Sequence, residues 1–318
     1  FRLMRIKTVK DSRSLTLIFP LPATQKYYRS RPLNMLGFLV GHEGKGSLLS
    51  LLKEEGLASG LSAGGGDSTS SYTSFNINIQ LTPKGLKRYT KVIERTFEYL
   101  RLLREKSLPR YVYEEVRRMA EIDYRFAEKT GGTRLVNMFS LLMQIYPLRS
   151  VESTPFLISE YRPRLFDSML FRLIPENMLA LLAAKNLETD QTEKYYGTEY
   201  AYLENRADLI KKWKKVKSHP KLRMPEANPF LPESLEVLPF SGTLSLSYQS
   251  LAGLKREGLD VELVQKLEEQ AGQSFVDLDE ILKKVGFQGT TVERRAFRET
   301  LAKHAQGSPI LLIDDPQS

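Results

Sequence analysis

The residues best suited to metal or acid–base chemistry in this chain are its three histidines, His42, His219 and His304. They stand in unrelated segments, and His42 alone has an acidic residue, Glu43, directly beside it. A zinc peptidase needs two neutral histidines, a third ligand and a carboxylate that accepts a proton from the metal-bound water. No pair of histidines has the His-x-x-Glu-His or His-Glu-x-x-His spacing. The sequence therefore predicts no catalytic residues and no metal ligands in this chain.

Two further motifs lack what their chemistry requires. A phosphate-binding loop needs serine or threonine directly after its lysine to hold magnesium, but Gly46 follows Lys45. A serine nucleophile needs a strand-to-helix elbow, whereas Ser59 and Ser62 lie in a glycine-rich stretch expected to be a strand. We interpret His42 and Glu43 as a polar pair that closes a helix end, because adjacent helical residues do not face each other.

The elements around His42 are two helices followed by an extended run. Tyr28 to Val40 has the dense apolar pattern typical of a buried helix. A second helix is expected from Ser47 to Glu55, and Gly56 should end it, because glycine adopts the left-handed conformation without steric penalty. Leu57 to Gly66 then follows as an extended, glycine-rich run with little side-chain bulk.

Strict alternation of apolar and polar residues from Tyr72 to Leu81 predicts a half-buried antiparallel strand. We expect this strand to form a hairpin with Leu57 to Gly64. Further strands are expected at Leu3 to Val9, Leu15 to Leu21 and Met178 to Ala184. The order of strands and helices predicts an α+β fold, in which helices cover a mostly antiparallel sheet and a helical extension follows.

Helices are expected between these strands, starting where Thr82 caps and Pro83 occupies the first turn. Two of the helices have apolar faces that we expect to be buried, although methionines can also form an adaptable binding surface. These faces consist of Val112, Val116, Met119 and Phe126 on one helix, and Leu135, Met138, Phe139, Leu142 and Met143 on the next.

The chain is expected to have four parts. Residues 1–185 form the α+β domain, 186–239 a connector with a basic helix, 240–307 a helical insertion, and 308–318 the first strand of a following, absent domain. The basic helix, Asp208 to Lys217, carries five lysines around Trp213. Such lysines could contact nucleic-acid phosphates. We favour a solvated helix face with one buried tryptophan, because recognition also needs a fold that fits a groove.

The composition excludes several kinds of site. The 318 residues carry a net charge of +9, include 41% hydrophobic residues and contain no cysteine, which excludes disulfides and thiolate metal sites. No apolar run approaches the roughly 18 residues of a membrane helix. We expect a soluble protein that binds neither nucleic acid nor membrane, and both the bacterial periplasm and the cytoplasm remain open. Because the chain starts at Phe1, we expect a fragment of a longer protein.

Several segments, in order, resemble the second domain of insulinase and pitrilysin-type zinc metallopeptidases, the inverzincins. The resemblance covers about residues 1–238 and returns near Ser308. The matching segments are Gly41-His42-Glu43-Gly44 with Gly46-Ser47-Leu48-Leu49, Phe19-Pro20-Leu21-Pro22 with Gln25-Lys26-Tyr27-Tyr28, and Tyr195-Tyr196-Gly197-Thr198. In that family the first domain carries His-x-x-Glu-His, and the second repeats the fold without the metal. The resemblance implies zinc and endopeptidase activity in the parent protein, and neither in this fragment.

The resemblance also implies a binding role, since the family's glycine-rich strand anchors the N-terminal end of the substrate. The corresponding residues here are Phe38, Gly41, Leu61, Ser62, Ala63 and Gly64. Phe38 stands where the family often has histidine, and Ala63 where it often has glycine, so the anchoring could be altered. Without the resemblance, these glycines would indicate only a twist or bulge.

Three functions follow. The first is the substrate-holding, non-catalytic part of an insulinase-like zinc metalloendopeptidase, with a peptide substrate and the remaining domains of the parent as partners. The second is a stand-alone peptide-binding or assembly module. The third, which we favour least, is a nucleic-acid binder.

Overall fold

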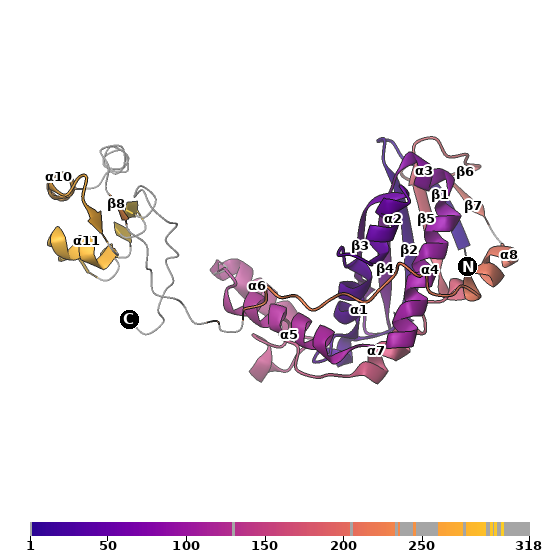
Figure 1. The fold of residues 1–318 in the computed structure, drawn as a ribbon, viewed down its shortest axis with the longest axis horizontal. Helices are drawn as coiled ribbons and strands as arrows, with labels where there is room; N and C mark the ends of the chain where they lie inside the picture. Colours follow the sequence, from indigo (N-terminus) through magenta and orange to yellow (C-terminus); the bar gives the residue numbers. More distant parts are fainter. Residues whose placement is uncertain are drawn as a thin grey trace. The chain divides into compact units, whose positions relative to one another are not determined.

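The computed structural model describes residues 2–128, 131–203, 206–232, 235, 244–245, 260–275, 278–290, 293–294, 296–297 and 300–301 of the chain. The chain divides into two compact units, Phe1–Pro232 and Glu233–Ser318 (Figure 1). Within the described part of the chain, no helix has the length and hydropathy to cross a membrane.

The first unit is built on a seven-stranded sheet with the strand order β3-β4-β2-β5-β1-β7-β6. The strands are β1 (Arg2–Lys7), β2 (Arg13–Pro22), β3 (Ala58–Ser68), β4 (Tyr72–Leu81), β5 (Leu179–Ala184), β6 (Gln191–Thr192) and β7 (Glu199–Leu203). Only β1 and β5 pair in parallel among these strands. The predicted α+β fold with a mostly antiparallel sheet is confirmed.

The sheet continues beyond residue 185, where we expected the domain to end. β7 pairs antiparallel with β1, with Met4 opposite Tyr202 and Ile6 opposite Tyr200. Because β7 has only five residues and its partner lies almost 200 positions earlier in the chain, local sequence gave little sign of this pairing. The segment treated as a connector therefore contributes strands to the sheet.

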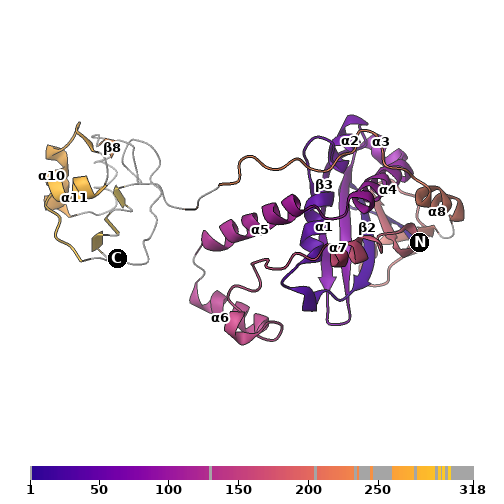
Figure 2. The same ribbon diagram turned by 60° about the horizontal axis from the view of Figure 1, so that its bottom comes forward.

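Eight α-helices are described in this unit: α1 (Pro32–Gly41), α2 (Leu48–Glu54), α3 (Pro83–Lys87), α4 (Tyr89–Lys106), α5 (Arg110–Arg125), α6 (Gly132–Leu142), α7 (Pro163–Leu170) and α8 (Ala207–Lys214). The helix ends follow the sequence signals. Ser47 accepts a hydrogen bond from the Ser50 amide, and Thr82 accepts one from the Gly85 amide. Gly56 follows α2 with a φ of 67°. Helices α1, α4 and α7 lie across one face of the sheet (Figure 2).

The core lies between this sheet face and the helices. Leu15, Leu17 and Phe19 on β2 are fully buried, as their alternation requires. Phe97 of α4 contacts Phe19 edge-on, with ring centroids 6.4 Å apart, and stacks on Trp213 of α8 at 6.1 Å. Trp213 is 1% exposed, which confirms the expected buried tryptophan and shows that α8 packs against the domain.

The prediction of a buried face on α5 and α6 is wrong for much of its length. Met119 and Phe126 of the α5 region are 38% and 52% exposed, and α6 has no buried residue. The end of α5 and α6 extend beyond the edge of the sheet in both views (Figures 1 and 2). Apolar periodicity identifies the apolar face of a helix, but it does not identify what covers that face.

The second unit contains the helices α10 (Val261–Glu269) and α11 (Leu278–Lys284), as expected of a helical extension. It also contains an unexpected two-stranded antiparallel sheet of β8 (Leu244–Ser245) and β9 (Ser274–Phe275). The strand expected within 308–318 lies outside the described residues.

Candidate functional site

The glycine-rich strand β3 forms one edge of the sheet. It pairs antiparallel with β4, with Leu61 opposite Ile79 and Ala63 opposite Ile77, as the hairpin prediction requires. Within the described part of the chain, β4 is its one strand partner. The N–H and C=O groups along its other side are therefore available to a further strand.

Helix α1 packs unusually closely on β3. A Cβ atom built on Gly37 would lie 2.9 Å from the Ala63 carbonyl oxygen, closer than real Cβ contacts. A Cβ on Gly41 would lie 3.5 Å from the Ala63 nitrogen. Because residues four apart share one helix face, these two glycines form a flat strip against which the strand rests. Close helix–strand approach therefore explains Gly37, whereas a Cβ on Gly41 would make only an ordinary van der Waals contact.

The structure brings all six residues of the predicted site together. Phe38 and Gly41 lie half-buried on α1, Ser62 is exposed on β3, and Ala63 and Gly64 are half-buried beside it. Leu61 is only 8% exposed and faces the core opposite Ile79, so only its backbone can contact a ligand. These placements are compatible with a site made mainly of backbone.

Ser62 is at the centre of a Gly-x-Ser-x-Gly spacing from Gly60 to Gly64. It lies in the middle of β3, however, and is paired in register with Asn78. A nucleophilic serine of this pattern lies instead at a sharp turn between a strand and a helix. The position of Ser62 therefore indicates a strand residue.

One exposed stripe of α1 runs along this edge. Most residues of the helix are buried, but Asn34, Phe38, Gly41 and the following His42 are exposed or half-buried. Asn34 and the N-cap residue Arg31 were not among the site residues predicted from the sequence. Asn34 lies four residues before Phe38 and Arg31 lies seven before it. This spacing places residues on the same side of a helix, and it could have been used to predict both.

The described residues around His42 do not fit a zinc ion. The His42 ring lies against the Phe38 ring, with centroids 5.9 Å apart, and a Cβ on Gly44 would lie 2.5 Å from His42 Nε2. His219 is engaged elsewhere, since its Nδ1 accepts a hydrogen bond from the Lys221 amide. The described residues include no group of three or more potential metal ligands, and His304 lies outside them.

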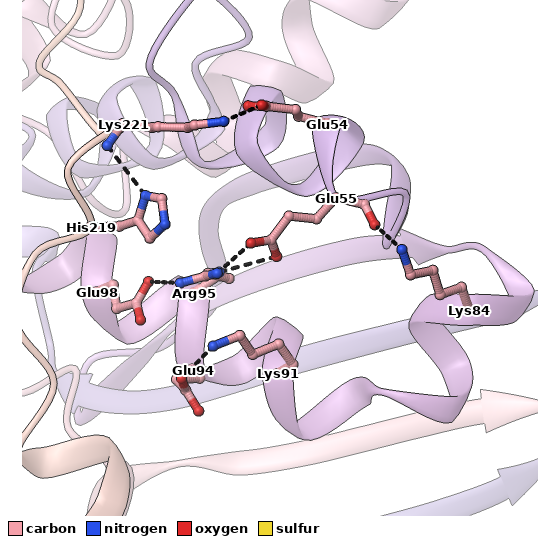
Figure 3. A network of polar contacts seen from close by, with 9 residues as sticks. All are labelled: Glu54, Glu55, Lys84, Lys91, Glu94, Arg95, Glu98, His219 and Lys221. Carbon is pink, nitrogen blue, oxygen red and sulfur yellow. Dashed lines mark hydrogen bonds and ion pairs between the residues drawn. The ribbon is translucent and has the colours of Figure 1, made fainter.

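A polar network fixes α2 against α4 and the chain that follows α8 (Figure 3). Arg95 of α4 donates hydrogen bonds to both Glu55 and Glu98. Burial opposes the charge of Arg95, but the hydrogen bonds to these two carboxylates outweigh it and raise its pKa. Lys221 pairs with Glu54 at the end of α2. The network thus holds the helix that leads directly into β3.

The lysines of α8 contact carboxylates of the domain. Lys212 Nζ lies 2.5 Å from Glu94 Oε2, and Lys214 pairs with Glu176. Burial favours the neutral form of Glu94, but hydrogen bonds from Lys212 and Lys91 outweigh it and lower its pKa. These contacts support the interpretation of α8 as a packed helix with a solvated face over that of a nucleic-acid site.

Two family models match most of the chain. Residues 3–119 match the peptidase M16 inactive domain, and residues 124–249 match the middle or third domain of peptidase M16. The first match contains α1, β3 and the candidate site. It also agrees with the absence of the zinc motif from the sequence.

Known proteins similar to this chain are large peptidases. Human insulin-degrading enzyme is 35% identical over 240 residues, which are 75% of this chain and 24% of that protein. Human nardilysin is 30% identical over 237 residues, covering 72% of this chain and 21% of that protein. The crystal structure of pitrilysin matches with a TM-score of 0.69 and 17% identity, over 95% of this chain and 40% of that one. The chain thus spans about a quarter of the curated relatives' length.

Proposed function

Because the chain belongs to the peptidase M16 family and includes its inactive domain, we propose that it holds the substrate for an insulinase-like zinc metalloendopeptidase. In this proposal, zinc and the catalytic residues belong to another part of the parent protein. The parent cleaves peptides in a chamber that closes against its remaining domains. The name of human insulin-degrading enzyme says that it acts on insulin. By analogy, the substrate proposed for the parent of this chain is a peptide.

The unpaired edge of β3 is the observation that supports substrate holding. An extended peptide can add to such an edge, and its main-chain hydrogen bonds give affinity without strict sequence demands. Gly64 and Gly65 have no side chain to keep a second backbone away, and Ala63 has only a methyl group. Long exposed edges promote aggregation unless they are covered. A substrate peptide inside a chamber would cover this one.

A scan of N-methylated peptides tests strand addition without changing the protein. Each peptide in a ten-residue series carries one N-methyl group, which removes one backbone donor. Alternate N–H groups of an added strand point towards β3, so methylation should weaken binding at every second residue. We expect a loss of about fivefold to tenfold at those positions, the size of one hydrogen bond. Equal losses at all positions, or none, would contradict strand addition.

A stand-alone assembly module is the second candidate, and the exposed apolar residues of α5 and α6 favour it. Val136 and Leu141 of α6 are 64% and 65% exposed, and such groups of apolar residues commonly mark protein–protein interfaces. The sequence of the parent gene separates the two candidates. A His-x-x-Glu-His motif upstream of Phe1 supports the peptidase, and its absence supports the assembly module.

A further inference from the structure

The exposed stripe of α1 leads away from Phe38 to a cavity at the helix N-terminus. Helix α1 runs antiparallel to β3, since Gly41 approaches Ala63 whereas Leu33 approaches Gly65. The edge of β3 and the stripe therefore flank the same path, which ends near Gly65 and Gly66. A peptide that adds to β3 would follow this path.

The cavity has a volume of about 400 Å³ and is lined by both elements of the path. Its lining includes Gly65 and Gly66 from the end of β3, and Arg31 and Asn34 from the start of α1. Tyr28 and Tyr146 form one wall, with their rings edge-to-face and their centroids 5.5 Å apart. Arg31 is the one charged side chain among the lining residues.

Arg31 is held in place without a carboxylate partner in the described part of the chain. Its Nε donates to the Tyr28 carbonyl oxygen at 3.2 Å, and its Nη2 donates to the Thr154 carbonyl oxygen at 2.9 Å. Burial lowers the pKa of Arg31, and Tyr146 partly opposes this. The cation has therefore lost part of its hydration and has gained only neutral acceptors, so an incoming anion would be favourable.

Arg31 also has a φ of 40°, in the left-handed region where asparagine and glycine are more usual. A residue other than glycine is strained in this region, and such a backbone persists only where the surrounding structure imposes it. Here the two carbonyl contacts hold the guanidinium of Arg31, which lines the cavity. The site is thus organised before any ligand arrives.

We propose that this cavity, the Arg31 pocket, binds an acidic side chain of the peptide that adds to β3. The inference rests on the proposed function and specifies its substrate class as peptides with a carboxylate at one defined position. The fork of N–H donors on arginine matches the two oxygens of a carboxylate. The hydroxyl groups of Tyr28 and Tyr146 can supply further donors to the same anion.

The geometry predicts where that residue lies in the peptide. Arg31 and Phe38 are seven residues apart, or about 10 Å along the helix axis at 1.5 Å per residue. An extended peptide rises about 3.3 Å per residue, and only alternate side chains point to the α1 side. The acidic residue therefore lies two or four positions from the residue beside Phe38.

The test is a glutamate scan in a fluorescent ten-residue peptide of alanine, serine and valine with an amidated C-terminus. At each position, the dissociation constants of the glutamate and glutamine peptides are compared at 150 mM salt. We expect glutamate to bind about tenfold more tightly at one position, and nearly equally elsewhere. The preference should vanish in Arg31→Gln and become smaller in Arg31→Lys, which keeps the positive charge but not the fork of donors. A peptide with a free C-terminal carboxylate shows whether that group can replace the side chain.

Arg29→Gln is the matched control, because Arg29 is two residues from Arg31 and lies over the Tyr28 ring, 5.7 Å from its centroid, but pairs with Glu160. It removes the same charge and should leave the glutamate preference intact. Binding without a preference at any position overturns the Arg31 pocket and leaves strand addition standing. A preference that survives Arg31→Gln, or disappears in Arg29→Gln, also overturns it. Failure of every peptide to bind overturns the proposed function itself.

Discussion

Gly37 of α1 faces the carbonyl oxygen of Ala63 in β3 so closely that a Cβ at Gly37 would lie 2.9 Å from that oxygen. The helix and the edge strand are therefore spaced by backbone, with no side chain between them at this point. This short spacing places the exposed stripe of α1 directly beside the open edge of β3. The site depends on it, because a more distant helix would no longer flank the path of a peptide.

Gly37→Ala should destabilise the protein, because the new methyl group meets main-chain atoms that cannot rotate away. We expect a loss of about 1–3 kcal/mol in the free energy of unfolding, measured by urea denaturation. Gly64→Ala is the control, since no atom lies within 4 Å of a Cβ at that position. A Gly37→Ala variant as stable as Gly64→Ala would show that the two elements separate without cost.

Glu94 should make the stability of the first unit dependent on pH. The pKa of Glu94 is lower in the folded state than in the unfolded state. Its ionised form therefore stabilises the fold at pH values above the unfolded-state pKa. This stabilisation is lost as the pH falls through the folded-state pKa. Glu94→Gln should therefore cost about 1–2 kcal/mol at pH 7, and the difference from the wild type should shrink below pH 4.

Glu105→Gln is the control for this prediction, because the pair of Glu105 with Arg101 is an exposed helix pair. It should change the free energy of unfolding by no more than about 0.5 kcal/mol at any pH. Equal destabilisation by Glu94→Gln at pH 7 and pH 3 would show that the charge of Glu94 does not stabilise the fold.

The second unit should be separable from the first. The division at Pro232 and Glu233 predicts that deletion of residues 233–318 leaves the thermal transition of the remaining chain within a few degrees of the original. Differential scanning calorimetry of both forms measures this. Loss of the cooperative transition after the deletion would show that the two units form one folding unit.

How far the sequence predicts this structure depends on the range of the contacts. The β3–β4 hairpin, the cap at Thr82 and the two ends of α2 all depend on residues close together in the chain, and all were predicted. The addition of β7 to β1 and the hydrogen bond from Arg31 to Thr154 join distant segments. No local pattern signals such contacts.

The candidate site shows the same limit. The resemblance directed attention to Phe38, Gly41 and the β3 strand, and the structure brings them together. It gave no reason to consider Arg31, which acquires its importance from the cavity formed with Tyr146. It also included Leu61, whose side chain belongs to the core. Only burial and tertiary contacts show that Arg31 belongs to the site and that the Leu61 side chain does not.

Proline substitution in β3 tests the central claim most directly, that the open edge of this strand holds a peptide. Successive N–H groups of a strand point to opposite sides, so one of Ser62 and Ala63 donates towards β4 and the other towards the open edge. Proline removes the donor at either position. The proline variant that loses the hydrogen bond to β4 should unfold more easily. The other proline variant, called the edge variant, is the one that loses the donor at the open edge.

The deciding measurement is the dissociation constant of an extended peptide for the edge variant, by calorimetric titration beside the wild type. We expect the edge variant to fold with a near-native thermal transition and to bind about fivefold to thirtyfold more weakly, as one uncharged hydrogen bond and its neighbours are lost. A well-folded edge variant that binds the peptide as tightly as the wild type would contradict the proposal that β3 anchors the substrate.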